Sequence, residues 1–176
     1  SSPPLNGGCF SMTDETFGHI NYEEGVGWTG EFPLEFGGTW HNLLLLAQVD
    51  EDEGTDITEA QRQALQCFDD KWDSVEPLLV DALIQYYNNE EKYSYGPENE
   101  EEAALWWPDI NTHEELYNAV TPATVVIPPD YLMESGRRVY LLLDRTWGGE
   151  DLDDNGVGVC FINEQIAEIG YKDIAF

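Results

Sequence analysis

The stretch from residue 139 to residue 176 limits the possible fold more than any other part of this chain. Three short apolar runs alternate there with turn residues at 148–149, 155–156 and 163–164. Runs of this length, bounded by Gly, Asn and Asp, are typical of short β-strands joined by tight turns. We therefore predict that the chain ends in a β-meander of three strands.

The first third of the chain also has a strand pattern. Apolar and polar residues alternate, or apolar residues run together, over residues 19–22, 28–36 and 39–49. Alternation predicts half-buried antiparallel strands, and the four leucines at 43–46 suggest burial on both faces of the third strand. Later in the chain, residues 124–127 form a compact apolar run closed by Pro128 and Pro129, which predicts a further strand.

Two capping boxes mark helix starts between these strands. Thr58 with Gln61, and Thr112 with Glu115, each place a hydroxyl and a long polar side chain three residues apart. After Gln61, apolar residues recur every three or four positions to about residue 87, but Pro77 interrupts them. Because proline is poorly tolerated inside a helix, we expect a kink or a fresh start there. The prediction is two main helices, about 58–72 and 74–89, and a short one, about 112–120.

The order of these segments predicts the α+β class. We expect a largely antiparallel sheet with the helices packed on one face and the β-meander at the C-terminal end. Residues 1–16 contain Pro3-Pro4 and Gly7-Gly8 without periodicity, so we expect a flexible N-terminal arm. A length of 176 residues favours one α+β domain over residues 17–176.

The formal net charge is −29, from 36 acidic and 7 basic residues. Such a charge disfavours nucleic acids and anionic membranes as partners, because both require Lys and Arg, and it favours a basic protein partner. The alternative is that the acidity only keeps the surface solvated. The three cysteines are far apart, which fits reduced thiols, and no apolar run approaches a membrane span. We therefore expect a cytoplasmic protein.

An acidic segment next to two tryptophans is the candidate partner-binding patch. Interfaces are enriched in Trp, and acidic side chains would attract a basic partner. In the alternative interpretation, the two tryptophans form a lid over the sheet. The residues of the predicted patch are Glu98, Glu100, Glu101, Glu102, Trp106 and Trp107.

One loop resembles the start of a calcium site. Asp151, Asp153 and Asn155 have the spacing of the first ligands in a calcium-binding loop. The position that should supply the last carboxylate is Ile162, and Asn155-Gly156 also has the composition of a hairpin turn. The sequence predicts no other cofactor.

No motif in the sequence predicts catalysis. His19, His41 and His113 lack the spacing of a metal-binding or catalytic pair, and no Gly-rich phosphate loop lies between a strand and a helix. We predict no catalytic residue. An enzyme would require a site that the sequence does not reveal.

Several of these segments together carry a resemblance. An early Trp-x-Gly, a Leu-x-Asp-x-x-Trp, a Gly-Val-Gly-Val and a closing Glu-Ile-Gly-x-x-Asp-Ile resemble a family of uncharacterised bacterial domains over about residues 18–176. The residues that carry the pattern are Trp28, Gly30, Asp144, Trp147, Gly156, Gly158, Gly170 and Asp173. The acidic turn with His that usually follows the Trp is replaced here by the loop at 148–155. The pattern also has a structural explanation, as turns, core packing and local hydrogen bonds.

The resemblance brings with it no established activity that could be assigned to this chain. Some similar proteins occur near toxin and immunity genes, which implies cytoplasmic binders. Together with the charge, this favours a non-enzymatic protein-binding domain, in particular an immunity protein that neutralises a basic toxin such as a nuclease. A calcium-binding or structural module centred on residues 151–156, and an enzyme with an unrecognised site, are the alternatives.

Overall fold

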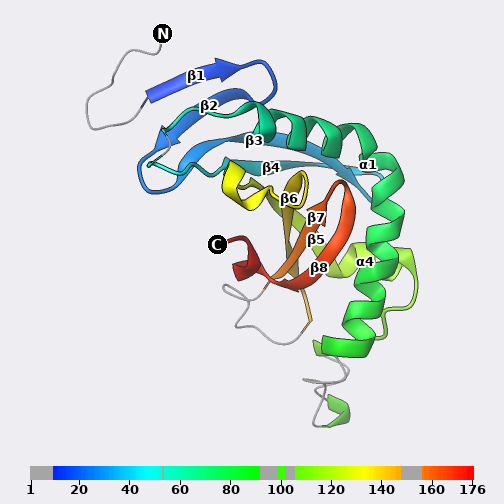
Figure 1. Cartoon of the computed structure of the whole chain (residues 1–176). Helices are drawn as coiled ribbons and strands as arrows, with labels where there is room; N and C mark the ends of the chain where they lie inside the picture. Colours follow the sequence, from blue (N-terminus) through cyan, green and yellow to red (C-terminus); the bar gives the residue numbers. More distant parts are fainter. Residues whose placement is uncertain (1–9, 53, 92–98, 102–105, 148–155) are drawn as a thin grey trace.

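Eight strands form one open sheet in which each strand lies beside its neighbours in the sequence (Figure 1). The structure is a computed structural model that describes residues 10–52, 54–91, 99–101, 106–147 and 156–176. The strands are β1 (Phe10–Asp14), β2 (Gly18–Glu23), β3 (Gly27–Phe36), β4 (Thr39–Ala47), β5 (Val120–Ile127), β6 (Arg138–Arg145), β7 (Val157–Ile162) and β8 (Gln165–Tyr171).

One pairing divides the sheet into two halves. Strands β4 and β5 are parallel, with Leu44 opposite Thr124 and Ala47 opposite Ile127, whereas the other described pairings are antiparallel. Parallel neighbours need a long crossover, and here it contains helix α1 (Glu59–Tyr86), the π-turn η2 (Tyr87–Glu91) and helix α4 (His113–Ala119). The predicted α+β class with a mostly antiparallel sheet is confirmed.

Helix α1 begins at the capping box that the sequence predicts. The hydroxyl of Thr58 accepts the backbone N–H of Gln61, and the Gln61 side chain accepts the backbone N–H of Thr58. The predicted separation into two helices is wrong, because α1 continues through Pro77. The ring of Pro77 faces solvent, while apolar residues before and after it are buried, so packing of both halves outweighs the lost hydrogen bond. The helix axis changes direction along its course (Figure 1).

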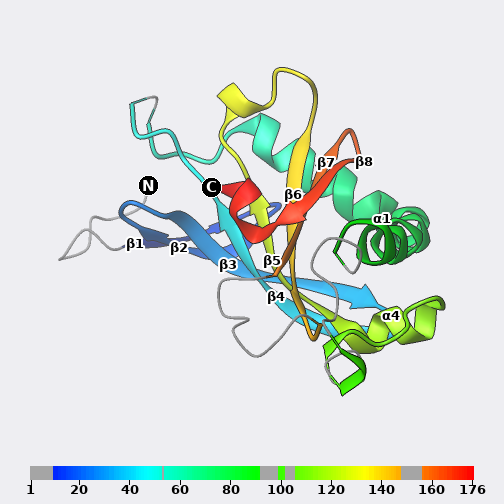
Figure 2. The ribbon, with the colours of Figure 1, turned by 90° about the horizontal axis from the view of Figure 1, so that it is seen from below.

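Each face of the sheet has its own apolar cluster. The larger cluster lies between the sheet and α1, where Phe68 of the helix contacts Phe32 of β3 and Phe161 of β7. Figure 2 shows α1 on one side of the sheet. The short C-terminal helix η4 (Lys172–Ala175) lies away from α1. A smaller cluster packs against η4 and contains Leu46, Val126, Tyr140, Leu142, Cys160 and Ala175.

Several details differ from the sequence-based expectation. Residues Phe10–Asp14, assigned above to a loose arm, form β1 and pair with β2. The predicted strand at 124–127 begins earlier, at Val120, because a register shift after Pro122 accommodates the proline. Leu44 is 50% exposed, so the four leucines of β4 are not all buried. The predicted turn at Asn163 and Glu164 is present, with positive φ angles of 51° and 62°.

An ion pair fastens the N-terminal hairpin to α1. Nε and one terminal nitrogen of Arg62 donate to Oδ1 of Asp14 at 2.9 and 2.7 Å. The other oxygen of Asp14 accepts the backbone N–H groups of Thr16 and Phe17. Asp14 is buried, and burial alone would raise its pKa; the hydrogen bonds from Arg62 and the two amides outweigh burial and hold the pKa of Asp14 below its usual value.

Candidate functional site

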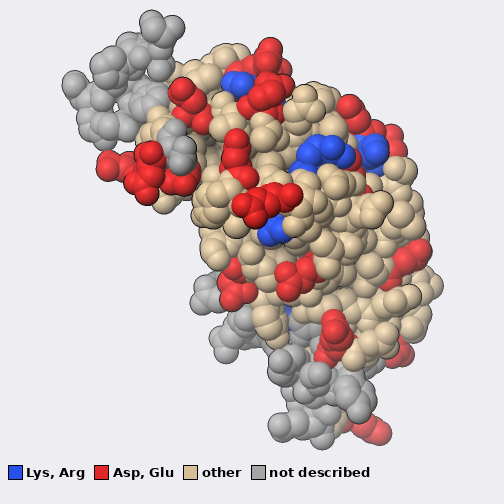
Figure 3. All heavy atoms as spheres, in the orientation of Figure 1, with Lys and Arg blue, Asp and Glu red and all other residues tan. Residues whose placement is uncertain are grey.

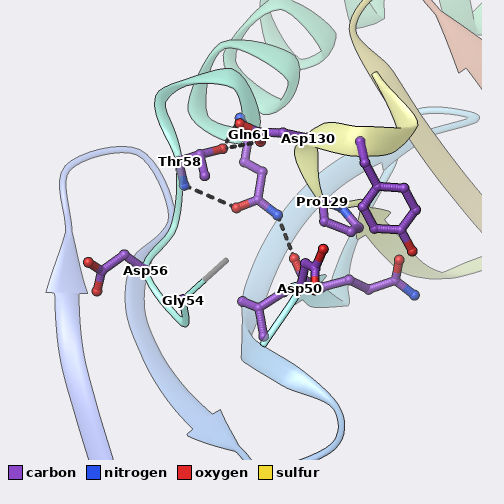
Figure 4. Close-up of a pocket in the computed structure, with 10 residues that line it drawn as sticks. Asp50, Gly54, Asp56, Thr58, Gln61, Pro129 and Asp130 are labelled. Atoms are coloured by element: carbon purple, nitrogen blue, oxygen red, sulfur yellow. Dashed lines mark hydrogen bonds between the residues drawn. The ribbon is translucent and has the colours of Figure 1, made fainter. Parts of the chain in front are cut away.

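A crevice with a volume of about 330 Å³ lies where the parallel strands β4 and β5 end and α1 begins (Figure 4). The carboxyl ends of parallel strands are a common place for binding sites, because the chain leaves the sheet there in two directions. The loop after β4, the first turn of α1 and the segment after β5 supply the walls. The lining residues are Gln48, Val49, Asp50, Gly54, Asp56, Thr58, Gln61, Pro129, Asp130 and Tyr131.

Gln61 holds the base of the crevice together. The residue is 1% exposed, and its side-chain amide donates to the backbone carbonyl oxygens of Gln48 at 2.7 Å and Pro128 at 3.2 Å. A longer contact of 3.5 Å reaches the carbonyl of Ile127. One side chain of α1 therefore joins the ends of β4 and β5.

The cap of α1 also reaches across the crevice. The hydroxyl of Thr58 donates to Oδ1 of Asp130 at 2.5 Å while it accepts the N–H of Gln61. Asp130 opens the short helix η3 (Asp130–Leu132) that follows β5.

The loop after β4 forms the outer wall of the crevice, and the β2–β3 hairpin holds this loop in place. Nε1 of buried Trp28 donates to the carbonyl oxygen of Thr55 at 2.6 Å. Glu51 accepts the hydroxyl of Tyr22 at 3.3 Å and the backbone N–H of Gly25 at 3.4 Å. Burial raises the pKa of Tyr22, and the negative charge of Glu51 raises it further, so this hydroxyl stays protonated and donates. The crevice is therefore preformed.

The lining of the crevice is acidic. It contains Asp50, Asp56 and Asp130, and none of its ten described residues is Lys, Arg or His. Figure 4 shows the carboxylate of Asp56 pointing away from Gln61. Over the face shown in Figure 3, acidic side chains are widely spread and basic ones occupy a few places.

The hydroxyl of Thr58 takes part in the cap of α1. It donates its proton to Asp130 and accepts the backbone N–H of Gln61, which is the arrangement of a helix cap. Over the described residues, no group of three or more His, Cys, Asp or Glu side chains could hold a metal ion. Asp151, Asp153 and Asn155 lie outside the described residues.

The histidines lie apart from this crevice. His41 lines a separate hollow of about 330 Å³ with Tyr117 and Glu114. Burial, together with the hydrogen bond from its hydroxyl to Glu76, raises the pKa of Tyr117 to about 12, so the phenol is neutral at ordinary pH. His113 is paired with Asp81 at 2.7 Å on the exposed side of α4, outside that hollow. The structure therefore does not bring the two histidines into one site.

The predicted partner patch is only partly accessible. Glu100 and Glu101 are exposed and Trp106 is half-buried. Trp107 is 5% exposed and stacks on Tyr87, with 6.2 Å between the ring centroids, so its ring is part of the core. A partner anchor needs a ring that the free protein exposes, which Trp107 does not provide. Glu98 and Glu102 lie outside the described residues.

The residues of the C-terminal sequence pattern make packing contacts. Trp147 is fully buried beside Tyr87, at a centroid distance of 4.7 Å. A Cβ at Gly158 would lie 2.4 Å from the carbonyl oxygen of Tyr171, so the close approach of η4 requires glycine there. The remaining pattern residues are Trp28, hydrogen-bonded to Thr55; Gly30, packed under Ile20; Asp144, paired with Lys172; Gly156 and Gly170, near Lys172 and Ile174; and Asp173, in the first turn of η4.

The crevice itself was not predicted from the sequence. Its residues come from three separate segments, and none of them forms a motif with fixed spacing. The available signals were the Thr58–Gln61 capping box and the acidic segment that precedes it, because together they place carboxylates at the start of a helix.

The fold and site define an α+β domain with an open eight-stranded sheet and an acidic crevice at its parallel pair. Residues 16–176 match the family described as a domain of unknown function, DUF6985, and the chain belongs to that family. No curated protein and no solved structure matches the chain. Within the described segments, no helix has both the length and the apolar character needed to cross a membrane.

Proposed function

We propose that this domain is a non-enzymatic protein-binding module whose partner is a basic protein. The observation that carries the proposal is the net charge of −29 combined with a preformed crevice whose lining has three Asp and no cationic residue. Opposite charge accelerates encounter and excludes acidic competitors, and a rigid surface limits the entropy lost on binding. An immunity protein that covers the active site of a basic toxin, such as a nuclease, is the form of this function that we favour.

Affinity capture from a lysate of the source cells tests the proposal. The immobilised protein is exposed to the lysate at low and at moderate salt, and bound proteins are identified by mass spectrometry. We expect one basic partner in stoichiometric amount that is retained at moderate salt. A diffuse set of basic proteins that is lost as salt rises would show that the acidity only solvates the surface.

Association kinetics with the purified partner then test the charge effect. We expect the on-rate to fall with salt and to fall further when surface carboxylates are replaced by lysine. Replacing Glu100 and Glu101, the described glutamates of the predicted patch, tests that patch separately from the crevice. An unchanged on-rate at low salt for this variant would remove the patch from the binding surface.

A further inference from the structure

A second hollow, of about 380 Å³, continues the crevice along the same edge of the molecule. The two hollows share Gln48, Val49, Pro129 and Tyr131, so they form one surface. Polar atoms supply the larger share of the exposed lining of this hollow, but most of its residues are apolar and come from the β2–β3 turn, η3, β6 and the C-terminal segment. These include Val26, Leu132, Tyr140, Ile174 and Phe176.

Three of the apolar side chains that line this second hollow are exposed to solvent. Val26 is 40% exposed, Tyr131 62% and Phe176 77%. These are three of the seven large apolar residues that are exposed in the described part of the chain, and they line one hollow. A gathering of exposed apolar side chains with a polar rim is typical of an interaction surface.

Charge decides what kind of partner fits this surface. The acidic crevice lies directly beside the hollow that contains Val26, Tyr131 and Phe176, and none of the described residues that line either one is Lys, Arg or His. A second copy of this chain carries the same net charge of −29, so repulsion disfavours self-association there. A segment with basic and apolar side chains complements both parts.

We infer that the joined hollows are the docking surface for an extended segment of a basic protein, with a Lys or Arg of that segment between Asp50 and Asp130 and a neighbouring apolar side chain against Val26, Tyr131 and Phe176. This inference rests on the proposed function and specifies its surface. The long stem of Lys or Arg packs on Val49 and Pro129, which line both hollows, while its charged end reaches the carboxylates. Gln61 and Trp28 hold the walls in place before binding.

A synthetic peptide tests the inference without knowledge of the natural partner. The probe is a nonapeptide in which Arg and Phe alternate between short Ser-Gly ends, titrated into the ¹⁵N-labelled full chain and followed by amide chemical shifts. Two matched peptides carry Ser in place of Phe or Glu in place of Arg. We expect saturable shifts at Val26, Val49, Asp50 and Tyr131, with affinity at least about tenfold lower for each matched peptide.

Variants of the protein locate the site. Tyr131→Ser removes an exposed ring, and Asp50→Asn keeps an acceptor for the backbone N–H of Asp52 while it removes the charge. We expect their combination to weaken the Arg–Phe peptide at least about tenfold. The matched control combines Leu78→Ser with Asp73→Asn, an exposed apolar and acidic pair on α1, and should bind like the wild type. Tyr131→Ser alone serves if the double variant does not fold.

We call the joined hollows the groove, and the protein with both Asp50→Asn and Tyr131→Ser the groove variant. Two results would overturn the inference. One is chemical shift changes that are spread over the whole surface when the peptide is added, and the other is equal peptide affinity of the groove variant and the wild type. These results differ from a failure of the proposed function. A captured partner that binds the groove variant at the wild-type rate leaves the binding function in place and removes the groove. Specific peptide binding without any captured basic partner supports the groove and counts against the proposed function.

Discussion

At the scale of single residues, Asp14 shows how this acidic chain uses its few cations. It is one of three buried polar or charged residues in the described structure, with Gln61 and Glu164. Arg62 satisfies one of its oxygens and two backbone amides satisfy the other. A buried carboxylate contributes to stability only while it remains ionised and paired, so the contribution depends on pH.

Replacing Asp14→Asn should therefore destabilise the protein by about 2 kcal/mol at neutral pH, the size of a hydrogen-bonded charge pair. The pKa of Asp14 in the folded state lies below its ordinary value. Its stabilisation is complete above the ordinary pKa and is lost as pH falls through the lower folded pKa. Urea denaturation at neutral pH and at about pH 3 should show the difference between the two proteins shrinking in acid.

Asp69→Asn is the matched control. Asp69 lies on α1 with much of its surface in solvent, and the partial burial of its carboxyl group, followed by the nearby charges of Asp70 and Asp73, raises its pKa. Because the ionised form is disfavoured in the folded state, removing this charge should leave stability unchanged or slightly higher at neutral pH. Equal losses for the two variants, or a difference for Asp14 that does not change with pH, would contradict the role assigned to the ion pair.

At the scale of elements, Gln61 is the residue through which α1, β4 and β5 meet. A carbonyl that loses its donor inside the protein costs about 1–3 kcal/mol. Gln61→Leu should therefore destabilise the fold by about 2 kcal/mol. Gln61→Glu should cost more at neutral pH, since a carboxylate would then face the carbonyl oxygens of Gln48 and Pro128.

Mild acid should partly restore the stability that the Gln61→Glu variant has lost, but it should not restore the stability of the Gln61→Leu variant. The introduced carboxyl is buried, which raises its folded pKa, and its protonated form can donate to a carbonyl again. Thermal melting of both variants across mild acid, with amide exchange of the loop after β4, measures this. Equal stability of the two variants at every pH would show that the side-chain amide does not hold the strand ends.

Sequence reasoning succeeded where the signal was local. The boxes at Thr58 and Thr112 and the apolar stripe of α1 depend on residues three or four apart, and all are present. Strand β1 was missed because Phe10–Asp14 is rich in polar residues and is held by pairing with β2 and by Arg62, which are not visible locally. The break at Pro77 was wrong because burial on both sides of the proline overrides its local preference.

The candidate site could not be predicted from the sequence, because the sequence does not show which distant segments the fold brings together. Adjacency in the chain does not specify which way a ring faces, and in the structure the ring of Trp107 is buried and stacks on Tyr87. The crevice joins segments that follow β4 and β5, and only the parallel pairing brings them together. That pairing depends on the long crossover between β4 and β5, and the spacing of apolar residues in the sequence does not indicate which strands pair across it.

At the scale of the whole molecule, the charge of −29 opposes compactness. Salt screens this repulsion, so Tm should rise with sodium chloride, by about 2–4 °C for each kcal/mol of repulsion removed. Differential scanning calorimetry from low to physiological ionic strength measures the rise. A flat or falling Tm would show that the acidic groups are already compensated in the folded state.

Calcium and magnesium at the same ionic strength provide the control. Screening alone predicts similar shifts for the two divalent ions. A further rise specific to calcium would indicate a site that binds only the native protein, and would direct attention to Asp151, Asp153 and Asn155. Equal shifts would leave the salt effect explained by charge alone.

The parallel contact between β4 and β5 also affects the order in which the protein folds. Each half of the sheet is built from hairpins between sequence neighbours, which close quickly, whereas the β4–β5 contact joins segments on either side of the crossover. We expect that contact to form late. The two walls of the crevice belong to different halves, so we expect the crevice to form only after β4 and β5 have paired.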